Sequence, residues 1–144
     1  MGKKRIIKKG GSSVDQELKS RSLGKVPKKK LASGILFIQS TFNNTLISLT
    51  DISGNNIMWS TSGSLGFKGA KKGTPFAASK VADLLAEKAK MIGIKEVDVV
   101  IKGVGAGRES AIRAFAAKNI IINKISDRTP IPHNGPKAKK PRRV

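Results

Sequence analysis

Three short runs in the first half of the chain have the length and composition of β-strands. They cover residues 35–39, 46–50 and 57–60. The first is apolar almost throughout, and the second alternates apolar with polar residues, as a half-buried strand does. Polar residues that favour turns separate the runs at 41–44 and 51–56. Such short connections predict an antiparallel three-stranded meander.

An amphipathic helix is predicted to follow. Thr74 is a suitable N-cap, Pro75 suits the first helical position, and Gly93 suits the position after the last turn. Between them, apolar residues recur with helical spacing at Ala77, Val81, Leu84, Leu85, Ala89 and Ile92. Lys88 falls within this stripe, where its stem can pack while its ammonium group reaches water. We therefore expect this helix to pack on the sheet.

The remaining elements predict the fold class. Residues 97–101 form a strand rich in Val and Ile, a second helix begins near Arg108, and residues 120–125 form a last strand. The packing stripe of the second helix is expected at Ala111, Ile112, Phe115 and Ala116. A helix between two strands favours parallel pairing. The sequence thus predicts an α/β fold with a mixed five-stranded sheet, an antiparallel β-β-β meander followed by α-β-α-β, and helices packed on it.

The distribution of charge divides the chain into three parts. Residues 1–30 hold 11 basic and 2 acidic residues, and residues 124–144 hold 7 basic residues and 1 acidic residue. We interpret residues 1–30 as a basic, disordered N-terminal arm and 31–127 as the globular domain. Residues 128–144 are interpreted as a basic, extended tail, because their prolines exclude regular structure. A solubility tail and a frayed terminus are the alternatives for the two ends.

The charge also predicts the class of partner. The excess of 29 Lys and Arg over 9 Asp and Glu opposes compaction unless a polyanion neutralises it, as in proteins that bind nucleic acid. No apolar run approaches the roughly 20 residues that span a bilayer, and we expect no membrane partner. One His and no Cys make neither a catalytic triad nor a zinc cluster, and the carboxylates form no obvious pair. We therefore expect no enzyme activity, no metal and no cofactor.

Residues 62–74 are predicted to form a loop that binds nucleic acid. Its four glycines let the backbone approach a ligand closely, and Lys68, Lys71 and Lys72 supply positive charge between them. Phe67 is placed to stack on a base. A flexible surface loop with one anchoring Phe is the alternative.

The segment from Gly103 to Arg108 lies between a strand and a helix and has glycine at every second position. A glycine-rich turn at a helix N-terminus is a general anion site, because backbone N–H groups converge there and the helix dipole favours negative charge. The dinucleotide fingerprint needs a third glycine where Arg108 stands, and the P-loop string does not occur. The planar guanidinium of Arg108 suits a pair of phosphate oxygens. We interpret the segment as a clamp on a nucleic-acid backbone, with a nucleotide-binding enzyme and a basic nucleoid protein as alternatives.

Several strings resemble the ribosomal protein S11 family in its bacterial or organellar form. They are FNNT at 42–45, GFKG at 66–69, TPFAA at 74–78, GRESA at 107–111 and TPIPHNG at 129–135. The resemblance implies a structural protein of the small-subunit platform that binds 16S-type ribosomal RNA (rRNA), bridges several RNA helices and helps form the Shine–Dalgarno cleft for the upstream mRNA. It also implies ribosomal proteins S7, S18 and S21 as neighbours, with initiation factor three nearby. The location would be the cytoplasmic ribosome or, alternatively, an organellar one.

The residues and the resemblance together predict an rRNA-binding set. Its members are Phe42, Asn43, Asn44, Phe67, Lys68, Lys71, Lys72, Gly103, Gly105, Gly107, Arg108, Arg113, Arg128, His133, Asn134, Gly135, Lys137, Lys139, Lys140, Arg142 and Arg143. Two departures from the family pattern affect this set. After the HNG string the family usually continues Cys-Arg-Pro-Pro-Lys-Lys, whereas this chain has Pro136-Lys-Ala-Lys-Lys-Pro141, so the charge is kept but the individual contacts of that piece do not carry over. Val104 and Ala106 stand where the family usually has prolines, so the loop is expected to be less preorganised when free.

Overall fold

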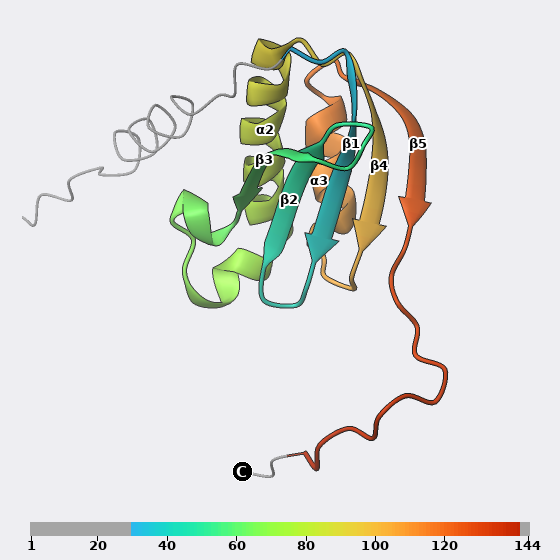
Figure 1. Ribbon diagram of the computed structural model, residues 1–144. Coiled ribbons are helices and arrows are strands. Elements are labelled where there is room, and N and C mark those ends of the chain that lie inside the picture. The colour runs from blue at the N-terminus through green and yellow to red at the C-terminus, as the bar shows by residue number, and fades with distance from the viewer. Residues whose placement is uncertain (1–29, 142–144) are drawn as a thin grey trace, which may run out of the picture.

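Within residues 30–141, which the computed structural model describes, five strands form one sheet and two α-helices lie on one of its faces (Figure 1). The predicted N-terminal arm up to residue 29, and Arg142 and Arg143, lie outside the described residues. In chain order the elements are β1 (Ser33–Ser40), β2 (Thr45–Thr50), β3 (Asn56–Thr61), the 3₁₀ helices η1 (Gly63–Leu65) and η2 (Gly69–Gly73), α2 (Pro75–Ile92), β4 (Glu96–Lys102), α3 (Gly107–Ala116) and β5 (Ile121–Asp127).

The sheet has the order β3-β2-β1-β4-β5, with β1 at its centre. β1 pairs antiparallel with β2, and β2 pairs antiparallel with β3. β1 pairs parallel with β4, and β4 pairs parallel with β5. Phe37 of the central strand β1 lies opposite Ser48 of β2 on one side and Val100 of β4 on the other. The predicted mixed sheet, an antiparallel meander followed by parallel crossover strands, is therefore confirmed.

The core lies between the two helices and the sheet face that they cover. The fully buried strand residues alternate along each strand: Leu36, Ile38, Ile47, Leu49, Val97 and Val99. Val81 and Leu85 from α2 and Phe115 from α3 complete the same cluster. The predicted stripe on the second helix is correct at Ala111 and Phe115 but wrong at Ala116, which is exposed. Ala116 follows Phe115 by one residue, so the helical repeat turns it away from the sheet.

The start and end of α2 are formed by the residues that the sequence indicated. The Oγ1 of Thr74 accepts a hydrogen bond from the backbone N–H of Ala77 at 3.3 Å. Gly93 has a φ of 97°, in the left-handed region where glycine has no steric penalty. Lys88 is buried within the apolar stripe, and the access of its ammonium group to water stays a prediction. Neither helix of the described part of the chain is long and apolar enough to cross a membrane.

The segment after β3 is more regular than the predicted loop, because it contains η1 and η2. Two reciprocal hydrogen bonds of 3.1 Å support the first of these short helices. The backbone N–H of Thr61 donates to Ser64 Oγ, and the backbone N–H of Ser64 donates to Thr61 Oγ1. Short side chains of this kind often bond to nearby backbone groups in turns. Gly66, with a φ of 89°, ends η1.

Candidate nucleic-acid interface

Four segments that carry predicted site residues meet at one end of the sheet. Because β1, β4 and β5 are parallel, their carboxyl ends lie at the same edge, and α2 and α3 both begin there (Figure 1). We call this end the carboxyl edge and define it by residues 41–44, 62–74, 103–108 and 128–129. In open α/β sheets, ligands commonly bind outside the carboxyl ends of the strands.

The glycines of the carboxyl edge are required by close packing. A Cβ atom on Gly103 would overlap the carbonyl oxygen of Ser40, and one on Gly105 would overlap that of Thr41. On Gly107 it would lie 2.6 Å from the Oγ1 of Thr45 and 2.7 Å from the Cβ of Ala78. The alternating glycines therefore fit the β4–α3 loop against the corner between β1 and β2.

Two of the three glycine amides are engaged within the chain. The N–H of Gly105 donates to the carbonyl of Ser40 at 2.9 Å, and the N–H of Gly103 donates to Thr129 Oγ1 at 3.2 Å. These two amides therefore serve the fold, and direct rRNA contacts of Gly103 and Gly105 stay a prediction. The first turn of α3 is different, because its N-cap residue, Ala106, provides no capping side chain. Its amides are the part of this loop still suited to an anion.

Arg108 bonds both to this loop and to the end of β5. Its Nη1 donates to the carbonyl of Gly103 at 2.6 Å, and its Nη2 forms an ion pair with Asp127 Oδ2. The Oγ1 and backbone N–H of Thr129 donate to Asp127 Oδ1 at 2.6 and 2.9 Å. These bonds from Thr129, followed by the bond from Arg108, lower the pKa of Asp127 to about 2. Arg108, predicted to hold phosphate, thus also ties the end of β5 to the β4–α3 loop.

The lysines between β3 and α2 have no acidic partner among residues 30–141. Lys68 and Lys71 are exposed and Lys72 is half-buried. Two cations elsewhere in the described residues do have acidic partners. Lys118 lies 3.3 Å from Glu87, and Arg113, a predicted site residue, lies 3.2 Å from Glu109.

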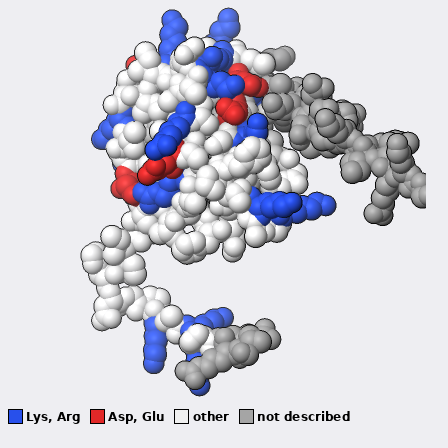
Figure 2. Space-filling view, turned by 180° about the vertical axis from the view of Figure 1, so that it is seen from behind, with Lys and Arg blue, Asp and Glu red and all other residues white. Residues whose placement is uncertain are grey.

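The view of the helix face shows the same contrast (Figure 2). Some basic side chains of the globular part lie beside acidic ones and others, at the top and low on the right of the view, do not, while the described tail carries basic side chains and no acidic ones. Lysines without an acidic partner therefore lie on the segment between β3 and α2 and on the tail, as well as at other exposed positions of the described residues. Such charge supplies the electrostatic, sequence-independent part of nucleic-acid affinity.

Three Phe residues lie in the carboxyl edge or at the start of α2 beside it. The ring of Phe67 packs edge-to-face against Phe76, with centroids 6.1 Å apart and planes at 83°. The ammonium group of Lys80 lies 5.4 Å from the centre of the Phe76 ring. Phe67 is therefore partly engaged, whereas Phe42 and Phe76 are 79% and 62% exposed. Sequence reasoning missed Phe76 as an exposed ring of this surface. The available signal was its position outside the apolar stripe of α2.

The turn between β1 and β2 holds the other predicted residues of this edge. Asn43 is exposed at its tip, and the Oδ1 of Asn44 is a buried acceptor without a hydrogen-bond partner within residues 30–141. Buried polar atoms are nearly always paired, so the exception marks unmet hydrogen-bonding capacity at this turn. The backbone of the same turn packs closely on Gly73, because a Cβ there would overlap the carbonyl oxygen of Phe42. The turn is thus enclosed by the β4–α3 loop on one side and the start of α2 on the other.

The tail leaves the carboxyl edge directly after β5. From residue 130 to residue 141 it has no helix or strand, and every residue is exposed (Figure 1). The extended shape predicted for this part is therefore confirmed. It carries the remaining predicted residues: Arg128, His133, Asn134, Gly135, Lys137, Lys139 and Lys140.

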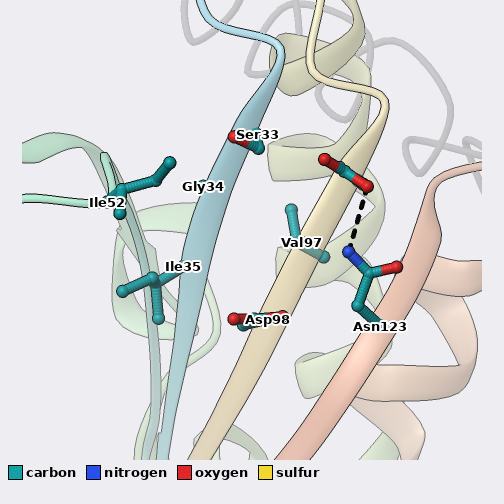
Figure 3. Close-up of a pocket in the computed structure, with 8 residues that line it drawn as sticks. Ser33, Gly34, Ile35, Ile52, Val97, Asp98 and Asn123 are labelled. Atoms are coloured by element: carbon teal, nitrogen blue, oxygen red, sulfur yellow. Dashed lines mark hydrogen bonds between the residues drawn. The ribbon is translucent and has the colours of Figure 1, made fainter.

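A pocket of about 220 Å³ lies at the opposite end of the strands (Figure 3). Glu96, Asp98 and Asn123 line it, and Ile52 reaches it from the β2–β3 turn. The Nδ2 of Asn123 donates to Glu96 Oε2 at 3.0 Å. None of the predicted site residues lines this pocket, and its carboxylates repel phosphate. Residues 30–141 contain no group of three or more side chains that could hold a metal ion.

The fold and the carboxyl edge together define a basic α/β protein that presents unpaired cations and an extended tail to a polyanion. The sequence model of the ribosomal protein S11 family matches residues 34–143, and the chain belongs to this family. It is thus a structural protein of the small ribosomal subunit that binds rRNA, and not an enzyme. Membership of this family excludes a nucleotide-binding enzyme that uses the Gly103–Arg108 loop. It also decides for a ribosomal protein over a basic nucleoid protein.

Proposed function

We propose that the chain binds 16S-type rRNA on the platform of the small subunit, with the carboxyl edge and the tail facing the RNA. It bridges several RNA helices there and helps form the Shine–Dalgarno cleft that holds the upstream mRNA. The observation that carries this proposal is the position of Lys68, Lys71 and Lys72. These lysines have no acidic partner among the described residues, and they lie at the end of the sheet from which the basic tail leaves.

The mechanism we propose is recognition of RNA shape through its backbone. The lysines of the carboxyl edge neutralise phosphates, and the uncapped first turn of α3 offers backbone N–H groups to another phosphate. The exposed rings of Phe42 and Phe76 add surfaces on which unpaired bases can stack. Arg113 stays within this proposal, because its pair with Glu109 is exposed and such pairs are weak enough to exchange for phosphate.

The tail supplies the contacts that bridge RNA helices. It extends away from the globular part and carries Lys137, Lys139 and Lys140 on a chain stiffened by prolines. A stiff, basic segment can lie between two phosphate backbones and neutralise both. Ribosomal proteins S7, S18 and S21, with initiation factor three, are the proposed neighbours, and the cytoplasm is the proposed location, with an organelle as the alternative.

Site-specific crosslinking inside the intact subunit tests this arrangement. The chain has no Cys, so a single introduced Cys gives one labelled position. We expect photo-crosslinkers on Asn43→Cys and Ala138→Cys to reach rRNA. Ala116→Cys is the matched control, because Ala116 is exposed at the other end of α3. Crosslinks to rRNA from Ala116→Cys alone would contradict the proposal.

A further inference from the structure

The end of β5 is tied to the β4–α3 loop by a closed set of hydrogen bonds, which we call the latch. It consists of Gly103, Arg108, Asp127 and Thr129. Arg108 bonds to the carbonyl of Gly103 and to Asp127, Thr129 bonds to Asp127, and the N–H of Gly103 donates to Thr129 Oγ1. The latch therefore holds the first residues after β5 in one position relative to the sheet.

The latch lies where the tail begins. The N–H of Arg128 donates to the carbonyl of Ile101 at 2.8 Å, which continues the pairing of β5 with β4 by one residue. Thr129 is then fixed by the latch, and Pro130 and Pro132 follow, each with a fixed φ. A fixed start followed by stiff residues gives the tail a preferred direction.

The charge of Asp127 makes this arrangement informative. A carboxylate beside an edge that is proposed to bind RNA repels phosphate and occupies Arg108, so electrostatics alone disfavours it there. Asp127 offsets this disadvantage through its three hydrogen bonds with Arg108 and Thr129, which hold the latch together. A binding segment that is already oriented loses less conformational entropy when it binds.

We propose that Asp127 and Thr129 are positioning residues for rRNA binding, which act through the tail by fixing its direction before the RNA is bound. This inference rests on the proposed function and adds a residue role to it. Asp127 itself contacts no phosphate. It strengthens binding although it carries the same charge as the ligand.

The direction in which one substitution changes the affinity for rRNA tests the proposal. Asp127→Asn removes a negative charge and frees Arg108, so direct electrostatics gives tighter rRNA binding, whereas loss of the latch gives weaker binding. We expect the affinity of the full chain for 16S-type rRNA to fall by about fivefold, the scale expected for ordering one or two more side chains on binding. Glu109→Gln is the matched control, because it removes an exposed acid from the first turn of α3 without touching the latch, and we expect no loss. Equal or tighter binding by Asp127→Asn overturns the proposal.

Two further measurements separate positioning from a general loss of structure. In a chain carrying Lys137→Ala, Lys139→Ala and Lys140→Ala, we expect Asp127→Asn to cause no further loss. The same fivefold loss in that background overturns the proposal. A nitroxide on Ala138→Cys should become more mobile in the free protein with Asp127→Asn or Thr129→Val, and unchanged mobility overturns it.

The outcome for the wild-type chain distinguishes the two proposals. Affinity for rRNA that does not depend on salt contradicts the proposed function, and the nitroxide spectra still decide whether the latch orients the tail. Salt-dependent affinity that rises with Asp127→Asn leaves the proposed function standing and overturns the latch.

Discussion

Alanine substitution of single glycines tests whether the β4–α3 loop is built for packing. Gly103 has a φ of 104°, and a Cβ there would also overlap the backbone of Ser40. Gly105 has the overlap without the positive φ, and Gly54 has a φ of 88° with nothing within 4 Å. The three positions therefore separate backbone strain from steric overlap within one protein.

The expected magnitudes follow from these two effects. An L-residue in the left-handed region costs about 1–2 kcal/mol, and loss of unfolded-state entropy returns about 0.4–1 kcal/mol, so Gly54→Ala should cost about 1 kcal/mol. Overlap with backbone that cannot move freely costs about 1–3 kcal/mol, so Gly105→Ala should cost about 2 kcal/mol. Gly103→Ala combines both effects and should cost about 3 kcal/mol, a large part of the roughly 5–15 kcal/mol that stabilises a typical domain.

Urea unfolding followed by far-ultraviolet circular dichroism gives the three free energies. The expected order of midpoints is Gly54→Ala highest, then Gly105→Ala, then Gly103→Ala. If Gly103→Ala and Gly105→Ala were no less stable than Gly54→Ala while rRNA affinity collapsed, the glycines would serve the ligand and the packing argument would be refuted.

Two further predictions concern this loop and the end of β5 that is tied to it. Ala106 has a φ of −68°, which proline adopts without strain, so Ala106→Pro should raise the free energy of unfolding by about 0.4–1 kcal/mol, and a lower urea midpoint would count against the loop geometry. The folded-state pKa of Asp127, about 2, lies below its ordinary value of 3.8, so its stabilisation is fully present above about pH 4 and is lost as the pH falls through about 2. The difference in urea midpoint between the wild-type chain and Asp127→Asn should accordingly shrink from pH 5 towards pH 2, and a constant difference would show that the carboxylate charge does not matter.

Most of the fold could be predicted from local patterns, because each element carries its own signal. The apolar repeat of α2, its Thr74 cap and Gly93 at its end are readable without any tertiary contact. The place of β4 in the sheet was not readable, because its pairing with β1 leaves no mark on either strand alone. Sequence reasoning also missed η1. It is supported by hydrogen bonds between Thr61 and Ser64, but in the sequence these residues belong to an ordinary polar stretch.

The candidate site was predictable as a set of segments but not as a geometry. Alternating glycines occur both in anion loops and where two backbones approach closely, and the sequence alone does not say which applies. The latch was not visible either, because Arg108 and Asp127 are 19 residues apart and meet only through the parallel pairing of β4 and β5. The lysines between β3 and α2 were the part of the candidate site that the composition indicated directly, because their positive charge needs no partner in the chain.

The salt dependence of rRNA affinity tests the central claim most directly. For the full chain and 16S-type rRNA, we expect the affinity to fall on the order of 10³-fold or more between 50 and 200 mM salt, as six or more phosphate contacts require. Substituting Lys68, Lys71 and Lys72 with Ala should reduce the slope of log affinity against log salt by about 2. The matched control substitutes Lys90, Lys95 and Lys124, which are exposed away from the carboxyl edge, and should change the slope less. A flat dependence, or equal slopes for the two triple variants, would contradict binding through this edge.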